Sequence, residues 1–253
     1  MRSHDFALQI KTNYIKGKIF YPPEKQKRNR GIVIFCHGIP GGAKDPGDPG
    51  YPLLAQELGE DGLQTVIFNF RGAGESPGDF DILGWAEDLK GVKDYVVSLD
   101  TDHPPVVLFG FSAGAAVAIY ACAQHRENIA GLILCGCPAD FDSILKERGI
   151  DRYITHCRNI GIIKTPGFPF DRSAWIESFR LLKPEKWVGA LTKTPKIFIH
   201  GDQDDVVPIE HAYRLYEKAL DPKELIIIKK GGHRLRLNET AMNAARAWLK
   251  KFI

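Results

Sequence analysis

The chain has no long apolar run and almost no excess of charge. No stretch approaches the ~18–20 apolar residues of a membrane-spanning helix, and the first ten residues, MRSHDFALQI, lack the apolar core of a secretion signal. Lysine and arginine number 34 against 31 aspartates and glutamates, and the net charge of +3 is too small to indicate a nucleic-acid or membrane partner. We therefore expect a cytoplasmic protein that binds neither nucleic acid nor membrane.

Cysteine is scarce too. The chain has 5 cysteines, and Cys36, Cys135 and Cys137 lie in apolar runs that are typical of buried strands. A thiol in such a run indicates a reduced core residue and not a disulfide framework. The spacing Cys135-Gly136-Cys137 also differs from that of the usual zinc and redox pairs. We expect no metal and no cofactor.

Short apolar runs alternate with amphipathic segments along most of the chain. The continuous apolar runs predict strands that are buried on both faces, at 31–36, 65–70, 106–110, 129–135, 196–200 and 224–229. The segments with helical spacing of apolar residues predict helices at 53–60, 82–99, 112–124, 208–220 and 239–252. Strands that alternate with helices of this length predict βαβ units and a doubly wound α/β fold with a parallel sheet.

Two segments depart from this alternation. Residues 6–21 hold two alternating runs broken at Lys16-Gly17, which predicts an antiparallel hairpin at a sheet edge. Residues 139–191 hold no clean strand, and a connection of about fifty residues without one is uncommon in a compact domain. We predict that 139–191 form a small helical cap, inserted into a core domain made of 1–138 and 192–253.

The sequence GFSAG at 110–114 lies between a predicted strand and a predicted helix. It fits the nucleophile elbow G-x-S-x-G, in which a strained turn raises the hydroxyl of the serine, here Ser112, above the sheet. A Cβ at either glycine would collide with the neighbouring backbone in such a turn. A glycine turn without a catalytic role is the alternative, so the partners of Ser112 decide between the two.

Histidines at the strand ends supply candidates for a base, because ligands gather at the carboxyl ends of parallel strands. In the hydrolase version of this architecture the triad runs in the order Ser, Asp or Glu, His, so the base follows the acid. Only His211 and His233 follow the strand that ends at His200. His211 falls inside a predicted helix, whereas His233 lies on a glycine-flanked loop, so we choose His233. We interpret His37 as a support for its own loop.

The chemistry of each residue type indicates which role it would have in the reaction. A serine hydroxyl is a weak nucleophile at neutral pH, so His233 would take the proton of Ser112 during attack. The oxyanion that forms needs donors. The backbone N–H of Ala113, at the start of a predicted helix, is one candidate. The backbone N–H of Ile39 is the second, because Pro40 has no N–H. Asp202, Asp204 and Asp205 compete as the acid, and Asp140 is a more distant candidate.

Five segments carry a resemblance to a known family, and they are HGIPGG (37–42), NFRGAGES (69–76), GFSAG (110–114), HGDQDDVVP (200–208) and GGH (231–233). With these, nearly the whole chain resembles the α/β-hydrolase family. The resemblance implies a mostly parallel sheet of about eight strands with helices on both faces, and hydrolysis through an acyl-enzyme. It also implies Asp204 as the acid, three residues before Val207-Pro208, with Asp205 as the second choice. We interpret RGAGES at 71–76 as a structural turn and not as a phosphate cradle.

Within the family the chain is similar to small-capped carboxylesterases, including cinnamoyl esterase-like members, and to serine aminopeptidases. The resemblance implies a cofactor-free serine hydrolase acting on small-molecule carboxylic esters. An aminopeptidase, a thioesterase or an acyltransferase would use the same triad, and an aminopeptidase would need carboxylates such as Glu147, Glu177 or Glu185 to hold a free amine. A non-catalytic ligand-binding protein on a hydrolase scaffold is a further alternative. The cap aromatics are typical either of an acyl pocket or of a core within the cap.

Overall fold

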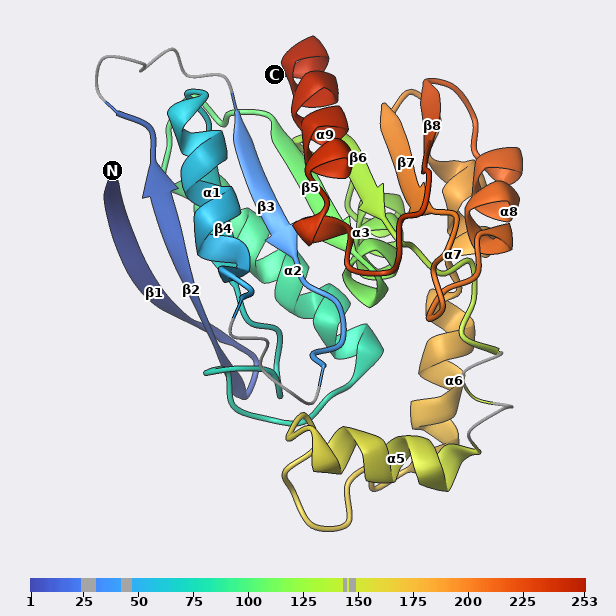
Figure 1. Ribbon diagram of the computed structural model, residues 1–253. Helices are drawn as coiled ribbons and strands as arrows, with labels where there is room; N and C mark the ends of the chain where they lie inside the picture. The colour runs from blue at the N-terminus through green and yellow to red at the C-terminus, as the bar shows by residue number, and fades with distance from the viewer. Residues whose placement is uncertain (24–30, 42–46, 143–144, 146–148) are drawn as a thin grey trace.

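The computed structural model describes residues 1–23, 31–41, 47–142, 145 and 149–253. Its centre is an eight-stranded sheet with the strand order β1-β2-β4-β3-β5-β6-β7-β8 (Figure 1). The strands are β1 (Arg2–Ile10), β2 (Asn13–Tyr21), β3 (Ile32–Cys36), β4 (Gln64–Phe68), β5 (Val106–Phe111), β6 (Ile129–Cys135), β7 (Lys196–Gly201) and β8 (Lys223–Ile228).

Strands β3 to β8 pair in parallel, and only the hairpin β1–β2 and its junction with β4 are antiparallel. The central strands β3, β5 and β7 are buried at every position, as continuous apolar runs require when helices cover both faces. The mostly parallel eight-stranded sheet confirms the predicted fold class. Because β3 and β5 are neighbours, their carboxyl ends bring the HGIPGG and GFSAG segments together.

Helices cover both faces of the sheet. Figure 1 shows α1 (Gly50–Glu60) and α9 (Glu239–Phe252) in front of the sheet, with α2 (Ile82–Ser98) and α3 (Ala113–Gln124) behind it. Helix α8 (Glu210–Lys218) buries its apolar side in the same core as α2 and α3. Each face of the sheet therefore has its own apolar core.

The edge hairpin exists, but the predicted position of its turn is wrong. Ile10 pairs with Asn13, so Lys11 and Thr12 form the turn, and Lys11 has a φ of +53°. Gly17 lies inside β2, where an added Cβ would be 2.4 Å from the Phe6 ring. The glycine therefore makes room for an aromatic ring on the neighbouring strand and does not mark a turn.

The described residues between 139 and 191 form helices and no strand. The helices are α5 (Ile150–Asn159), α6 (Arg172–Leu182), α7 (Pro184–Trp187) and the 3-10 turn Val188–Ala190. In Figure 1, α5 and α6 extend beyond the end of the sheet toward which the arrows of the parallel strands point. The division of the chain into a core and a cap at 139–191 remains our interpretation, and Glu147 lies outside the described residues.

Aromatic side chains of this segment pack on one another. Trp175 and Phe179 are 4% and 2% exposed, and their ring centroids are 5.0 Å apart. Both rings contact Phe80 of the core, and Trp175 Nε1 donates to the Phe80 carbonyl at 3.0 Å. These two rings therefore have a packing role and do not line an acyl pocket, but the core that they join is the one that also holds α2 and α3.

All five cysteines are buried with free thiols, which confirms that Cys36, Cys135 and Cys137 are core residues. Burial raises the pKa of each of these thiols. None of the helices in the described part of the chain is long and apolar enough to cross a bilayer.

Candidate active site

Ser112 lies in a strained turn between β5 and α3. Its φ of +53° and ψ of −125° are far from the regions that an L-residue prefers, and its N–H donates to the Cys135 carbonyl at 2.8 Å. A Cβ on Gly110 would lie 2.4 Å from Ala115 Cα, and one on Gly114 would lie 2.2 Å from the Cys36 carbonyl oxygen. The close backbone contacts expected of a nucleophile elbow are therefore present at both glycines.

Two backbone N–H groups flank Ser112. Ala113 is the first residue of α3, so its N–H belongs to the donors that a helix leaves unused at its start. On the other side, Gly38 is so close that an added Cβ would lie 2.9 Å from Ser112 Cβ and 3.5 Å from Ser112 Oγ. Gly38, the residue that precedes Ile39, therefore lies beside Ser112. This arrangement suits an oxyanion hole made from the N–H groups of Ile39 and Ala113.

His37 holds the loop that carries Ile39. Its Nε2 accepts a hydrogen bond from the Phe70 N–H at 3.1 Å, so Nδ1 carries the proton and donates to the Gly38 carbonyl at 2.7 Å. Burial lowers the pKa of His37 to about 4, although the bond to Gly38 opposes this shift. His37 is therefore neutral at physiological pH, and its contacts agree with the interpretation of a loop support.

The lowered pKa predicts a pH dependence of stability. An unfolded chain protonates this histidine near pH 6.5 and the folded chain only near pH 4, so the unfolded state binds more protons in this window. His37 should therefore remove about 3 kcal/mol from the free energy of unfolding as the pH falls from 6.5 to 4. Urea unfolding of wild type and His37→Asn across this range measures it. The variant should show the shallower pH dependence, and equal slopes would contradict the assignment.

Asp204 and His233 form a hydrogen-bonded pair. Asp204 follows β7 and His233 follows β8, and Asp204 Oδ2 lies 2.8 Å from His233 Nδ1. The other carboxylate oxygen accepts from the N–H groups of Val206 at 3.0 Å and Val207 at 2.8 Å. The Asp204 side chain is fully buried, whereas the imidazole is 20% exposed. Asp204 is thus held by its own loop in position to orient the ring.

The environment keeps Asp204 ionised. Burial raises the pKa of its carboxyl, but the hydrogen bonds from His233, Val207 and Val206 outweigh burial and hold the pKa below its ordinary value. His200 Nε2 also lies 3.4 Å from Asp204 Oδ2 and 2.8 Å from the Val207 carbonyl. Because burial lowers the pKa of His200, this contact is not an ion pair at neutral pH.

The imidazole of His233 lies at the end of β6, the strand beside the one that leads to Ser112. An added Cβ on Gly136, at the end of β6, would be 3.4 Å from the His233 ring. The neighbouring residue Cys135 is the one whose carbonyl binds the Ser112 N–H. His233 and Ser112 therefore lie on either side of the end of β6. Ser112 Oγ donates to no acceptor among the described residues.

The other candidates have different partners. His211 Nδ1 accepts from the Ala139 N–H at 3.0 Å, and Asp140 binds Arg214 at 2.6 Å. Asp202 accepts from the Lys230 N–H, and Asp205 is exposed. Among the competing acids, only Asp204 is recorded in a hydrogen bond to a candidate base within the described residues.

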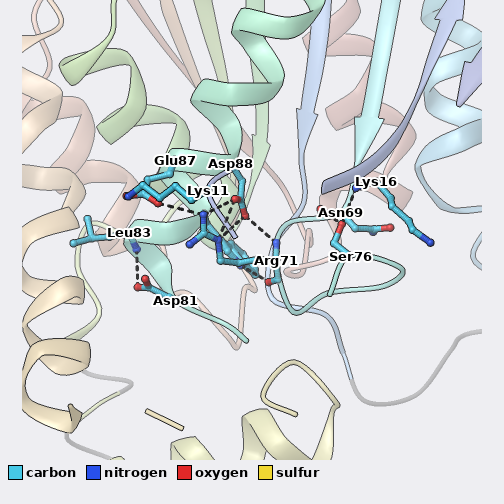
Figure 2. A network of polar contacts seen from close by, with 10 residues as sticks. Lys11, Lys16, Asn69, Arg71, Ser76, Asp81, Leu83, Glu87 and Asp88 are labelled. Atoms are coloured by element: carbon cyan, nitrogen blue, oxygen red, sulfur yellow. Dashed lines mark hydrogen bonds and ion pairs between the residues drawn. The ribbon is translucent and has the colours of Figure 1, made fainter. Parts of the chain in front are cut away.

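Two features of the surroundings were not predicted. His200 stands first in HGDQDDVVP, four residues before Asp204, and its place in that segment is the signal that could have identified it. The second is a network around Arg71 and Asp88, which Figure 2 shows between the RGAGES segment and α2. The spacing of these two residues in the sequence does not predict their contact, because Asp88 lies on α2 and Arg71 lies outside that helix.

Comparison with known proteins gives a family match over part of the chain. Residues 27–146 match the family model of the serine aminopeptidases, S33. An uncharacterized protein of Bacillus subtilis, YqkD, is 29% identical over 213 residues, which are 79% of this chain and 64% of that protein. YfhR of Escherichia coli K12, also uncharacterized, is 27% identical over 203 residues, 79% of this chain and 62% of YfhR. The chain thus spans less than two thirds of the length of these curated relatives.

Solved structures match nearly the whole chain. Est1E from Butyrivibrio proteoclasticus, solved with bound ferulic acid, has a TM-score of 0.73 at 20% identity and covers 98% of both chains. An α-β serine hydrolase homologue from Coxiella burnetii has a TM-score of 0.63 at 25% identity and covers 98% of this chain and 96% of its own. Together with the eight-stranded sheet, these matches show that the chain has the α/β-hydrolase fold.

Proposed function

We propose that this protein is a serine hydrolase that cleaves carboxylic esters with Ser112 as nucleophile, His233 as base and Asp204 as the acid that orients it. The observation that carries the proposal is the 2.8 Å hydrogen bond between Asp204 and His233, beside a serine in a strained turn. Ser112, Asp204 and His233 follow the parallel strands β5, β7 and β8 of one sheet, in the chain order of an α/β-hydrolase triad.

The reaction follows from these positions. Because Asp204 binds Nδ1, the His233 Nε2 is left to take the hydroxyl proton while Ser112 Oγ attacks the ester carbonyl. The carbonyl π electrons move to oxygen, and the N–H groups of Ile39 and Ala113 bind the resulting oxyanion. The intermediate collapses as the C–O bond breaks, and the imidazolium gives its proton to the departing alcohol. Water, deprotonated by His233, then cleaves the acyl-enzyme and releases the acid.

Several observations favour an ester substrate over a free amine. Glu177 pairs with Arg180 on an exposed helix face, and Glu185 is held by Lys183 and Arg214, so neither carboxylate is left for an ammonium group. Est1E, which shares the fold, was solved with ferulic acid. The same triad would serve an aminopeptidase, a thioesterase or an acyltransferase, and the serine aminopeptidase family match favours the first of these. A panel of p-nitrophenyl esters of different chain length, run beside aminoacyl anilides, separates the two main candidates.

The proposed partners are small-molecule esters, with no nucleic acid and no membrane. We further propose a cytoplasmic location, which the five free thiols support because a reducing compartment preserves them.

Labelling of Ser112 tests the proposal. A fluorophosphonate probe should modify the wild-type chain, and Ser112→Ala should abolish both labelling and ester hydrolysis because the probe and the ester both react with the activated serine. Ser98→Ala, which removes an exposed hydroxyl on α2, is the matched control and should be labelled like wild type. A wild-type chain that takes no label would favour the alternative, a ligand-binding protein without catalysis.

A further inference from the structure

A buried ion pair joins Arg71 to Asp88 (Figure 2). Arg71, the first residue of RGAGES, faces Asp88 of α2. Its Nε lies 3.0 Å from Asp88 Oδ1, its Nη2 lies 2.7 Å from the same oxygen, and its backbone N–H donates to Oδ2 at 2.9 Å. The Asp88 side chain is 0% exposed and that of Arg71 is 10% exposed. Arg71 thus binds Asp88 through both its side chain and its backbone.

The guanidinium has a fixed place on α2. An added Cβ on Gly84, one turn before Asp88, would lie 2.5 Å from Arg71 Nη1, so the guanidinium rests against the helix at a position where α2 has no side chain. Glu87 gives Nη2 a second carboxylate at 3.2 Å. Burial raises the pKa of Asp88, and the bonds from Arg71 act against this shift. The RGAGES arginine is therefore engaged by α2, which disfavours a phosphate cradle.

Contacts lead from Arg71 to the loop beside Ser112. The Arg71 carbonyl accepts from Trp85 Nε1 at 3.0 Å, and the Trp85 ring packs edge-on against His37 with centroids 5.3 Å apart. The residue before Arg71, Phe70, donates its N–H to His37 Nε2 at 3.1 Å. His37 then donates to the Gly38 carbonyl. Two residues that contact the imidazole are therefore connected to the Arg71 backbone. Phe70 precedes Arg71 in the chain, and Trp85 donates a hydrogen bond to the Arg71 carbonyl.

We propose that Arg71 and Asp88 are positioning residues of the oxyanion hole, which act through Phe70, Trp85 and His37. The proposal rests on the proposed serine hydrolase function. A buried ion pair stabilises a protein little more than apolar side chains of similar size would. Unlike apolar side chains, however, it can fix the position of nearby backbone groups through hydrogen bonds. Here the oriented backbone is that of residues 70 and 71, which hold the His37 ring.

Arg71→Lys tests the proposal. Lysine keeps the charge but has no planar fork to bind Asp88 twice, so the backbone of residues 70–71 should shift. We expect kcat to fall by about 10- to 100-fold with KM within about threefold of wild type, because a displaced N–H loses contact with the oxyanion more than with the substrate. Affinity for a trifluoromethyl ketone, which forms a tetrahedral oxyanion on the serine, should fall by the same factor.

Arg246→Lys is the matched control, since it makes the same substitution in an ion pair between α9 and Asp61, outside the candidate site. If both variants keep kcat and ketone affinity and differ from wild type only in thermal stability, the Arg71 pair is merely structural and the inference is overturned. If Arg71→Lys does not fold, Trp85→Phe replaces it, because this variant removes the bond to the Arg71 carbonyl and keeps a ring. Its kcat should fall with KM unchanged, and an unchanged kcat overturns the inference.

The wild-type controls separate this inference from the proposed function. A wild-type chain that hydrolyses esters, beside an Arg71→Lys variant with full kcat, overturns the positioning role alone. A wild-type chain that is neither labelled by the fluorophosphonate nor active on esters overturns both.

Discussion

His233→Ala is expected to lower kcat by several orders of magnitude, on the order of 10⁶-fold as in a serine protease that loses its histidine. Without the imidazole, nothing at the end of β8 takes the proton of Ser112 as attack proceeds. The fold should persist, because the ring is partly exposed and Asp204 keeps the bonds from Val206 and Val207. Steady-state ester hydrolysis measures the loss, and thermal unfolding checks the fold.

The matched variant is His211→Ala, because His211 is the other histidine that follows Asp204 in the chain. Its Nδ1 accepts from the Ala139 N–H, so its removal should affect stability and leave kcat within about tenfold of wild type. A loss below about tenfold in His233→Ala would show that the base is misassigned. A reversal, with the larger loss in His211→Ala, would show which residue replaces it.

Features with local causes could be predicted from the sequence. The turn at Ser112 needs glycines two residues before and after it, since a Cβ on Gly110 or Gly114 would overlap backbone. The buried strands are equally local, because a run covered on both faces is apolar throughout, as in β3 and β5. Residue type and spacing carry this information without knowledge of the fold.

Features that depend on a distant partner could not be predicted. Gly17 accommodates the Phe6 ring on the next strand, and in the sequence it is indistinguishable from a turn glycine. Arg71 meets Asp88 only because the segment that follows β4 lies against α2. The predicted strand ends place Asp204 and His233 at the same edge of the sheet, but only the structure shows which aspartate binds the ring. No motif in residues 139–191 predicts a substrate.

The choice among the aspartates leads to the second large effect. Asp204→Asn should lower kcat by about 10⁴-fold, the loss seen when a triad aspartate is amidated, whereas Asp205→Asn should stay within about threefold of wild type. Asn can still accept from the Val206 and Val207 N–H groups through one oxygen. Its NH₂ group, however, would then face His233 Nδ1 as a donor. The imidazole would have to accept there, carry its proton on Nε2, and lose its ability to deprotonate Ser112.

Asp205 offers a closely matched control, because it is adjacent in sequence and of the same residue type, but its side chain is exposed. Both variants remove one negative charge from the same loop, so a general electrostatic effect would lower kcat equally in both. A defect confined to Asp204→Asn, with unfolding temperatures that match between the variants, would instead arise from the hydrogen bond to His233. Equal losses of kcat would mean that this bond does not set the tautomer, and the acid of the proposed triad would have to be sought elsewhere.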